Sequence, residues 1–379
     1  MDTSSVLWTN WQEQLKELLP GMHGHQKKTL ALFVLGIVLS GSAVMQRVAE
    51  TLSEHGLSEA KMSSIERRLA RFIATKRIVV SLIWKLFVAQ VLAPFRGQHL
   101  YFVLDKTPFR DDLTIVYLGV LVHSRVLPVA WAVMPAQTTW DEGQWNIVGR
   151  LLDQVGVHLP DTSCTLLADR GLTGMPLVKL CTDRGWHYLL RVCAEHTCRR
   201  SFNGNLEQTW KRFGQIALKR GFRWYGKARV WQEETLDTFV SLVWDPDCEE
   251  PWLLISDEGA GRRQVQVYAW RMRVEATFQD SKSRGWNIEA SWIVDRAHLD
   301  RLLLALFLAL WWVSHLAAAC LHHGQRQRFD RVDRRDKSIF RLGRLRLLDI
   351  LRRARNRASL RHCLPFQKTN TGWRFALRF

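Results

Sequence analysis

Four polar side chains in residues 267–283 have the types and the spacing of a phosphodiester-binding site. This stretch, VYAWRMRVEATFQDSKS, lacks Pro and Gly and predicts a helix. At about 100° per residue, Tyr268, Arg271, Glu275 and Lys282 fall within an arc of roughly 60°. The carboxylate can hold a metal ion, and the two cations and the phenol can hold phosphate oxygens. The alternative is an exposed helix face on which Arg271 and Glu275 pair at i,i+4.

Two aspartates extend this chemistry. Asp105 ends the apolar run of HLYFVLDKT, and Asp169 ends the apolar run of CTLLADRGL. We expect both at the C-terminal ends of strands, where α/β sheets usually place their reactive groups. With Glu275 they supply oxygen-only ligands, which suit two Mg²⁺ ions, with Mn²⁺ as a substitute. Two such ions about 4 Å apart can activate an attacking oxygen and stabilise the leaving oxygen. A single Asp at a strand end is otherwise a turn former.

Residues 98–193 contain the alternation of strands and helices that would position these aspartates. Apolar runs bounded by turn residues predict strands, and longer amphipathic runs predict helices. The expected strands are 99–107, 114–123, 126–134, 164–172 and 187–192, and the expected helices are 142–157 and 175–186. A turn at 123–125 makes the second and third strands a hairpin. This order of elements predicts a mixed α/β sheet.

The rest of the chain divides by composition around that core. We expect a helical DNA-binding domain at 1–97, a first core part at 98–193, a β-rich insertion at 194–263, a second core part at 264–325 and a basic C-terminal region at 326–379. The insertion contains Trp210, Trp224, Trp231, Trp244 and Trp252. We expect most of these rings in its core, with stacking on an unpaired base as the alternative for one of them.

The charge balance indicates a polyanionic partner. Lys and Arg number 54 against 36 Asp and Glu, which gives a net charge of +18 and a pI near 10.1. Residues 300–379 hold eighteen Lys and Arg against five Asp and Glu, a net +13. Such an excess favours nucleic acid or, less often, an anionic membrane. A second basic region interleaves Arg67, Arg68, Arg71, Lys76 and Arg77 with an apolar helical stripe. It predicts a DNA-binding helix, with a solvated basic face as the alternative.

Residues 302–321 are twenty residues without a formal charge, long enough to cross a bilayer. A buried core helix is the favoured interpretation, with a membrane anchor as the alternative. The first residues show no secretory signal, so we expect a reducing cytoplasm. The seven cysteines include no Cys-x-x-Cys pair and read as thiols. Two incomplete zinc patterns remain as alternatives: Cys193 with Cys198, and Cys320 with His322 and His323.

The spacing Tyr-(2)-Arg-(3)-Glu-(6)-Lys over residues 268–282 resembles the signature of one subgroup of the DDE transposases of bacterial insertion sequences. The first acid of that family is commonly followed as Asp-x-Thr, which matches Asp105 in LDKT. The second commonly appears as Asp-Arg-Gly, which matches Asp169 in ADRG. The 106 positions from Asp169 to Glu275 leave room for an insertion in the core. The resemblance is specific over 100–190 and 264–290.

The resemblance implies an RNase H-like core that is interrupted by an all-β insertion. Asp105, Asp169 and Glu275 would bind two Mg²⁺ ions, while Tyr268, Arg271, Lys282 and Arg170 would bind DNA phosphates. The reaction would be nicking at the element ends, followed by attack of the freed 3′-hydroxyl on target DNA. The implied partners are double-stranded DNA and a second copy of the chain in the DNA synapse. The implied location is the bacterial nucleoid, with no membrane partner.

Two other functions fit the same residues. A nuclease or resolvase on this fold would cut DNA without joining it. A catalytically inactive relative would act as a DNA-binding repressor, although three intact acids count against that interpretation.

Overall fold

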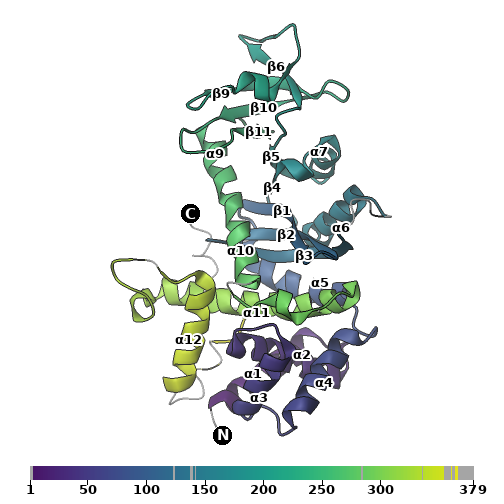
Figure 1. Ribbon diagram of the computed structural model, residues 1–379, viewed down its shortest axis with the longest axis vertical. Helices are drawn as coiled ribbons and strands as arrows, with labels where there is room; N and C mark the ends of the chain where they lie inside the picture. Colours follow the sequence, from purple (N-terminus) through teal and green to yellow (C-terminus); the bar gives the residue numbers. More distant parts are fainter. Residues whose placement is uncertain are drawn as a thin grey trace.

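The computed structural model describes residues 3–122, 124–136, 140, 142–282, 285–334, 336–353, 360 and 363–365. These residues form an elongated molecule with helices from the N-terminal region at one end and a mixed sheet through the middle (Figure 1). Strands from residues 197–256 extend the sheet to the other end. The predicted α/β class, with a helical N-terminal region and a helix in the basic C-terminal region, is confirmed.

The first five strands form the centre of the molecule. They are β1 (Leu100–Phe109), β2 (Leu113–Val122), β3 (Arg125–Pro135), β4 (Cys164–Ala168) and β5 (His187–Arg191). Each corresponds to a predicted strand, and β2 and β3 form the predicted hairpin. Their order is β3-β2-β1-β4-β5, with β1 antiparallel to β2 and parallel to β4. All of β4 is buried, as expected for a parallel strand that is covered on both faces.

The register of β1 against β4 brings the two aspartates to neighbouring positions. The last parallel pair is Leu104 with Ala168, so Asp105 and Asp169 are the next residues on adjacent strands. Asp169 follows the end of β4, as predicted. The prediction that Asp105 ends its strand is wrong, because β1 continues to Phe109 through its pairing with β2. On one side of Asp105 the neighbouring strand β4 has ended, and on the other side β2 continues.

Strands from residues 197–256 add to the same sheet. They are β6 (Thr197–Phe202), β7 (Asn205–Leu206), β8 (Lys211–Arg212), β9 (Arg223–Val230), β10 (Leu236–Val243) and β11 (Trp252–Ser256), with a short helix α8 (Phe213–Ile216). Antiparallel pairing of β11 with β5 joins them to the centre, and the described residues contribute eleven strands to the sheet. The five tryptophans of this region are partly buried, and three of them, Trp224, Trp231 and Trp252, pack against the hydrophobic core, as expected for most of the five. The outer strands lack cover on one face, and β9 buries only Ala228 and Val230.

Helices lie on both sides of the central strands. The helices α6 (Gln144–Gly156) and α7 (Met175–Thr182) are on one side, and α9 (Arg262–Ala269) and α10 (Arg273–Ser281) are on the other (Figure 1). The prediction of one helix over 267–283 is wrong in two places. A 3₁₀ turn at Trp270–Met272 separates α9 from α10, and α10 ends at Ser281. The chain then turns back so closely that a Cβ on Gly285 would collide with the Asp280 carbonyl oxygen.

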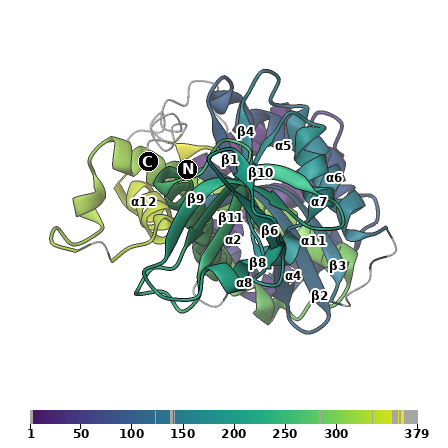
Figure 2. The same ribbon diagram turned by 90° about the horizontal axis from the view of Figure 1, so that it is seen from above.

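Five helices form the N-terminal end of the molecule. They are α1 (Thr3–Leu18), α2 (Gly24–Ser40), α3 (Met45–Glu54), α4 (Met62–Ala74) and α5 (Val80–Leu92). The helix α12 (Ile339–Arg353) packs beside them, on the opposite side of the molecule from α6 and α7 (Figure 2). Arg344 of α12 donates hydrogen bonds to the carbonyls of Val38, Leu39 and Ser40, at the end of α2. This arginine of the basic region therefore caps a helix, because those carbonyls lack intrahelical partners.

The uncharged run 302–321 lies in α11 (Arg296–His322), a helix between the sheet and the N-terminal helices. Its most apolar 18-residue window has a mean hydropathy of 2.0, and 89% of that window is buried inside the protein. It is the one unbroken helix in the described ranges that is long and apolar enough to cross a membrane. The burial favours the core-helix interpretation over the membrane-anchor interpretation.

Asp300 of α11 is expected to make stability depend on pH. Its Oδ1 accepts a hydrogen bond from Trp131 Nε1 at 2.7 Å, and burial raises the pKa of Asp300 to about 6. The folded protein therefore binds a proton more readily than the unfolded chain, so ionisation of Asp300 lowers stability as pH rises from 4 to 6. Asp300→Asn should be more stable than wild type by about 3 kcal/mol at pH 7 and similar at pH 4. Urea unfolding at both pH values measures this difference, and an equal gain at both would contradict it.

Candidate active site

One guanidinium group joins the two aspartates. Arg271 donates from Nη2 to Asp105 Oδ2 at 2.9 Å, and the same nitrogen lies 3.6 Å from Asp169 Oδ2. Asp105 belongs to β1, Asp169 follows β4, and Arg271 lies in the 3₁₀ turn between α9 and α10. The side chains of Arg271 and Asp105 are only 7% and 14% exposed. The ion pair is therefore largely shielded from water, which strengthens its electrostatic attraction.

Tyr268 holds the second aspartate from the same side. Its hydroxyl donates to Asp169 Oδ1 at 3.2 Å. The ring is buried and packs edge-on against Trp252 of β11, with ring centroids 5.4 Å apart. Burial raises the pKa of the Tyr268 phenol far above its usual value, so the hydroxyl keeps its proton and serves as a donor.

Glu275 is exposed in the first turn of α10. Burial raises the pKa of Asp105, Arg271 opposes that rise, and the negative charges of Asp169 and Glu275 add to it. The charges of Asp169 and Glu275 therefore act on the Asp105 carboxyl. The alternative of an exposed, i,i+4-paired helix face is wrong, because Arg271 and Tyr268 are buried against the sheet. Among the described residues, the ion pairs of Arg271 are to Asp105 and Asp169 and not to Glu275.

The other two predicted phosphate-binding residues lie at the flanks of this cluster. Lys282 donates from Nζ to the Pro108 carbonyl at 2.7 Å, near the end of β1, and lies 3.2 Å from Glu289. Arg170 is exposed and pairs with Glu250 at 2.9 Å. Neither residue has an ion pair with a predicted catalytic acid within the described part of the chain.

Sequence reasoning missed Arg191, the last residue of β5. Its Nη1 lies 3.8 Å from Asp169 Oδ1, and its Nη2 donates to Glu250 at 2.9 Å. The signal was present in the sequence, because HYLLR predicts a strand that ends in Arg191 next to the strand that Asp169 follows. The carboxyl ends of adjacent parallel strands meet at one edge, so the two side chains come together.

The oxygens that could hold divalent metal ions belong to Asp105, Asp169 and Glu275. Carboxylates are suitable ligands for Mg²⁺ or Mn²⁺, and the negative charges of Asp169 and Glu275 both act on Asp105. Arg271 lies between two of the acids. Over the described ranges, no three His, Cys, Asp or Glu side chains are grouped as metal ligands, neither at the predicted acids nor at the cysteines for which zinc was the alternative interpretation. All seven cysteines are free of disulfides.

Comparison with known proteins identifies one family. The model of a transposase DDE domain matches residues 120–312, which is just over half of the chain. The matched span contains Asp169, Tyr268, Arg271 and Glu275, and it begins after Asp105. No curated protein matches the sequence significantly.

Proposed function

Because the chain belongs to the family of transposase DDE domains, we propose that it nicks DNA at the ends of a mobile element and joins the freed 3′-hydroxyl groups to target DNA. The observation that best supports this proposal is the register of β1 and β4. That register places Asp105 and Asp169 side by side, and Arg271 contacts both. The negative charge of Glu275 contributes to the raised pKa of Asp105. Asp105 and Asp169 thus share one cation, and we propose that Glu275 completes the site with them.

We also propose that the catalytic core is RNase H-like and belongs to the subgroup with the Tyr-Arg-Glu-Lys signature of bacterial insertion sequences. Three antiparallel strands followed by two parallel strands, in the order β3-β2-β1-β4-β5, support this assignment. The strands β6 to β11 would be the insertion at 194–263. The packing of Tyr268 against Trp252 supports a role for these strands in shaping the site.

Each residue of the cluster has a separate role in this proposal. Asp105, Asp169 and Glu275 would hold two Mg²⁺ ions, which when bound would supply charge stabilisation and activation of the attacking oxygen for an in-line displacement. Arg271 and Tyr268 would exchange their hydrogen bonds to the acids for hydrogen bonds to phosphate oxygens. Lys282 and Arg170 would bind phosphates farther along the DNA, one on each flank of the cluster.

The proposed partner is double-stranded DNA, as the net charge of +18 favours. We propose that two copies of the chain act together in the DNA synapse, in the bacterial cytoplasm.

The experiment that tests this function uses DNA from the regions that flank the coding sequence. The purified full-length chain is incubated with these ends and Mg²⁺, and new 3′ ends and joined products are mapped. Ends with a scrambled sequence are the control. Cleavage at a defined position followed by joining is the expected result. Cleavage without joining would instead favour a nuclease or resolvase, and binding without cleavage would favour a repressor.

A further inference from the structure

An acidic loop lies beside the candidate active site, between β10 and β11. Residues 245–250 (DPDCEE) contain four acidic residues and no Lys or Arg, in a chain whose net charge is +18. The loop leads into Trp252, the first residue of β11, and the ring of Trp252 packs against Tyr268 of the site. The last acid of the loop, Glu250, therefore lies close to the catalytic cluster.

Glu250 contacts two guanidinium groups at once. Its Oε2 accepts a hydrogen bond from Arg170 Nη1 at 2.9 Å and another from Arg191 Nη2 at 2.9 Å. Arg191 in turn lies 3.8 Å from Asp169 Oδ1 through its Nη1. A carboxylate oxygen that accepts from two guanidinium groups makes the kind of contact that a phosphate oxygen makes with arginine. Glu250 therefore satisfies donors that are suited to phosphate, next to one of the proposed catalytic acids.

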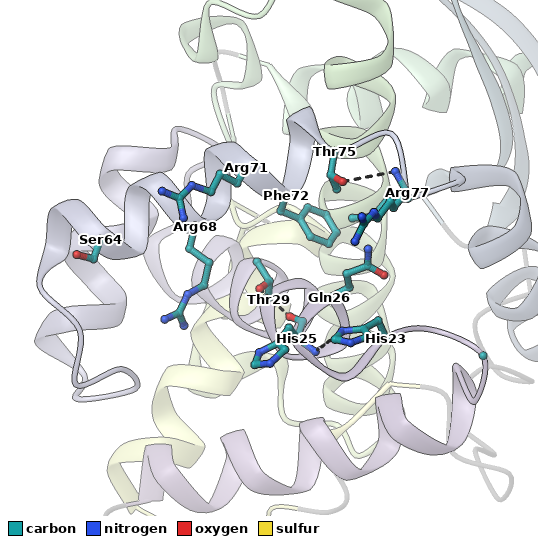
Figure 3. A pocket seen from close by; sticks show the side chains of 12 residues that line it. His23, His25, Gln26, Thr29, Ser64, Arg68, Arg71, Phe72, Thr75 and Arg77 are labelled. Atoms are coloured by element: carbon teal, nitrogen blue, oxygen red, sulfur yellow. Dashed lines mark hydrogen bonds between the residues drawn. The ribbon is translucent and has the colours of Figure 1, made fainter.

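A second basic part of the molecule lacks such an acid. Arg68, Arg71 and Arg77 line a pocket between α2 and α4 (Figure 3). None of the described residues that line this pocket is Asp or Glu. A basic cluster of this chain can therefore fold without an acid in its lining. The pairing of Glu250 with two arginines is thus not imposed by the excess of positive charge alone.

The Glu250 carboxylate can leave these arginines without a change in the backbone. The Glu250 side chain is 52% exposed and that of Arg170 is 47% exposed, so water screens their attraction. Arg191 is 16% exposed and also donates to the Pro251 carbonyl at 3.3 Å, which would keep its guanidinium group in place after Glu250 leaves. Rotation of the Glu250 side chain into water would free the donors of both arginines.

We propose that Glu250 is an autoinhibitory residue of the active site. In the protein without DNA, its carboxylate occupies the donors of Arg170 and Arg191, and a DNA phosphate must displace it before the strand can reach Asp169. This inference rests on the proposed function, which supplies DNA as the substrate. A carboxylate and a phosphate cannot share the same donors at low cost, because two negative charges in close contact repel each other. Glu250 therefore lowers the affinity of the active site for DNA.

A matched pair of variants in the acidic loop tests the proposal. Glu250→Gln and Glu249→Gln remove one negative charge from adjacent positions, but Glu249 is exposed and has no ion pair in the described part of the chain. Affinity of the full-length chain for a duplex of the element end is measured by fluorescence anisotropy, without divalent ions so that the DNA stays intact. Glu250→Gln should tighten binding roughly fivefold, the scale of one or two partly exposed ion pairs. Glu249→Gln should stay within about twofold of wild type, because salt screens its charge.

The same two variants in a chain without the arginines separate autoinhibition from a general effect of charge. With Arg170→Gln and Arg191→Gln in place, Glu250→Gln should tighten binding no more than Glu249→Gln does. A gain that persists without the arginines would overturn the proposal. In Mg²⁺, at a DNA concentration below the dissociation constant, Glu250→Gln on its own should also raise the cleavage rate by about the factor by which it tightens binding.

The remaining outcomes distinguish this inference from the proposed function. Equal affinities of Glu250→Gln and Glu249→Gln, with wild-type melting temperatures, would overturn the autoinhibition and leave the cleavage proposal standing. Weaker binding by Glu250→Gln would make Glu250 a residue that positions Arg191, and would also overturn it. Tighter binding by Glu250→Gln in a chain that cuts no DNA would support the autoinhibition and reject the cleavage proposal. Failure of the wild-type chain to bind any duplex would reject both.

Discussion

Glu275→Gln is expected to abolish DNA cleavage in Mg²⁺ while duplex binding stays within a few-fold of wild type. Glutamine keeps the size of the side chain but removes the negative charge that a metal ligand provides. The loss should be about 10³-fold or more, the scale on which one group that stabilises a transition state acts. Cleavage of a labelled element end measures the first effect, and anisotropy of the same DNA measures the second.

The control for this variant is Glu17→Gln, a change of the same type at an exposed residue of α1. It should cleave at the wild-type rate. If Glu275→Gln also lost duplex binding while remaining folded, Glu275 would have a role in shaping the DNA-binding surface. If it kept full activity, the three-acid site would be rejected.

Arg271→Met is expected to lower the free energy of unfolding by about 3 kcal/mol at neutral pH. The change leaves Asp105 without the cation that now neutralises it at 2.9 Å, in a position shielded from water. The negative charge of Asp169 should be destabilised less, because the Tyr268 hydroxyl and the Arg191 guanidinium group also lie close to it. Urea unfolding measures the loss. An unchanged free energy would show that the Arg271 contacts are not stabilising in solution.

Added Mg²⁺ should stabilise Arg271→Met more than it stabilises wild type, because the ion would no longer compete with the guanidinium for the acids. Thermal melting with and without Mg²⁺ provides this readout without DNA or activity. Arg125→Met is the matched control, since Arg125 forms a similarly buried ion pair with Asp280 at 2.6 Å. It should also be destabilised, but with the Mg²⁺ response of wild type. Equal Mg²⁺ responses for all three proteins would refute competition at the acids.

The strands and helices around the site were predictable because their signals are local. Apolar runs with turn residues at their ends located the five central strands, and residue spacing placed Tyr268 and Arg271 on the same side, although a 3₁₀ turn interrupts the predicted helix between them. The meeting of Asp105 with Asp169 also followed from strand order, since both come after runs that pair in parallel. The extension of β1 beyond Asp105 did not, because it depends on the partner strand β2.

Contacts between distant residues were the part that the sequence did not reveal. The i,i+4 spacing suggested that Arg271 pairs with Glu275, but its guanidinium group forms ion pairs with Asp105 and Asp169 instead. The sequence at the break between α9 and α10 contains no Pro or Gly from which the break could be predicted. The capping of α2 by Arg344 joins residues about 300 positions apart, so composition alone assigned that arginine to the basic surface.

The pairing of β11 with β5 has a mechanical consequence. Main-chain hydrogen bonds run without interruption from the acids to the far strands, so bending one part against the other would break the ladder at Leu254 and Arg191. The strands β6 to β11 are therefore held to the core by main-chain hydrogen bonds, and not by a flexible linker alone. A load applied at β9 or β6 would be transmitted through β11 to Arg191, and from there to Asp169.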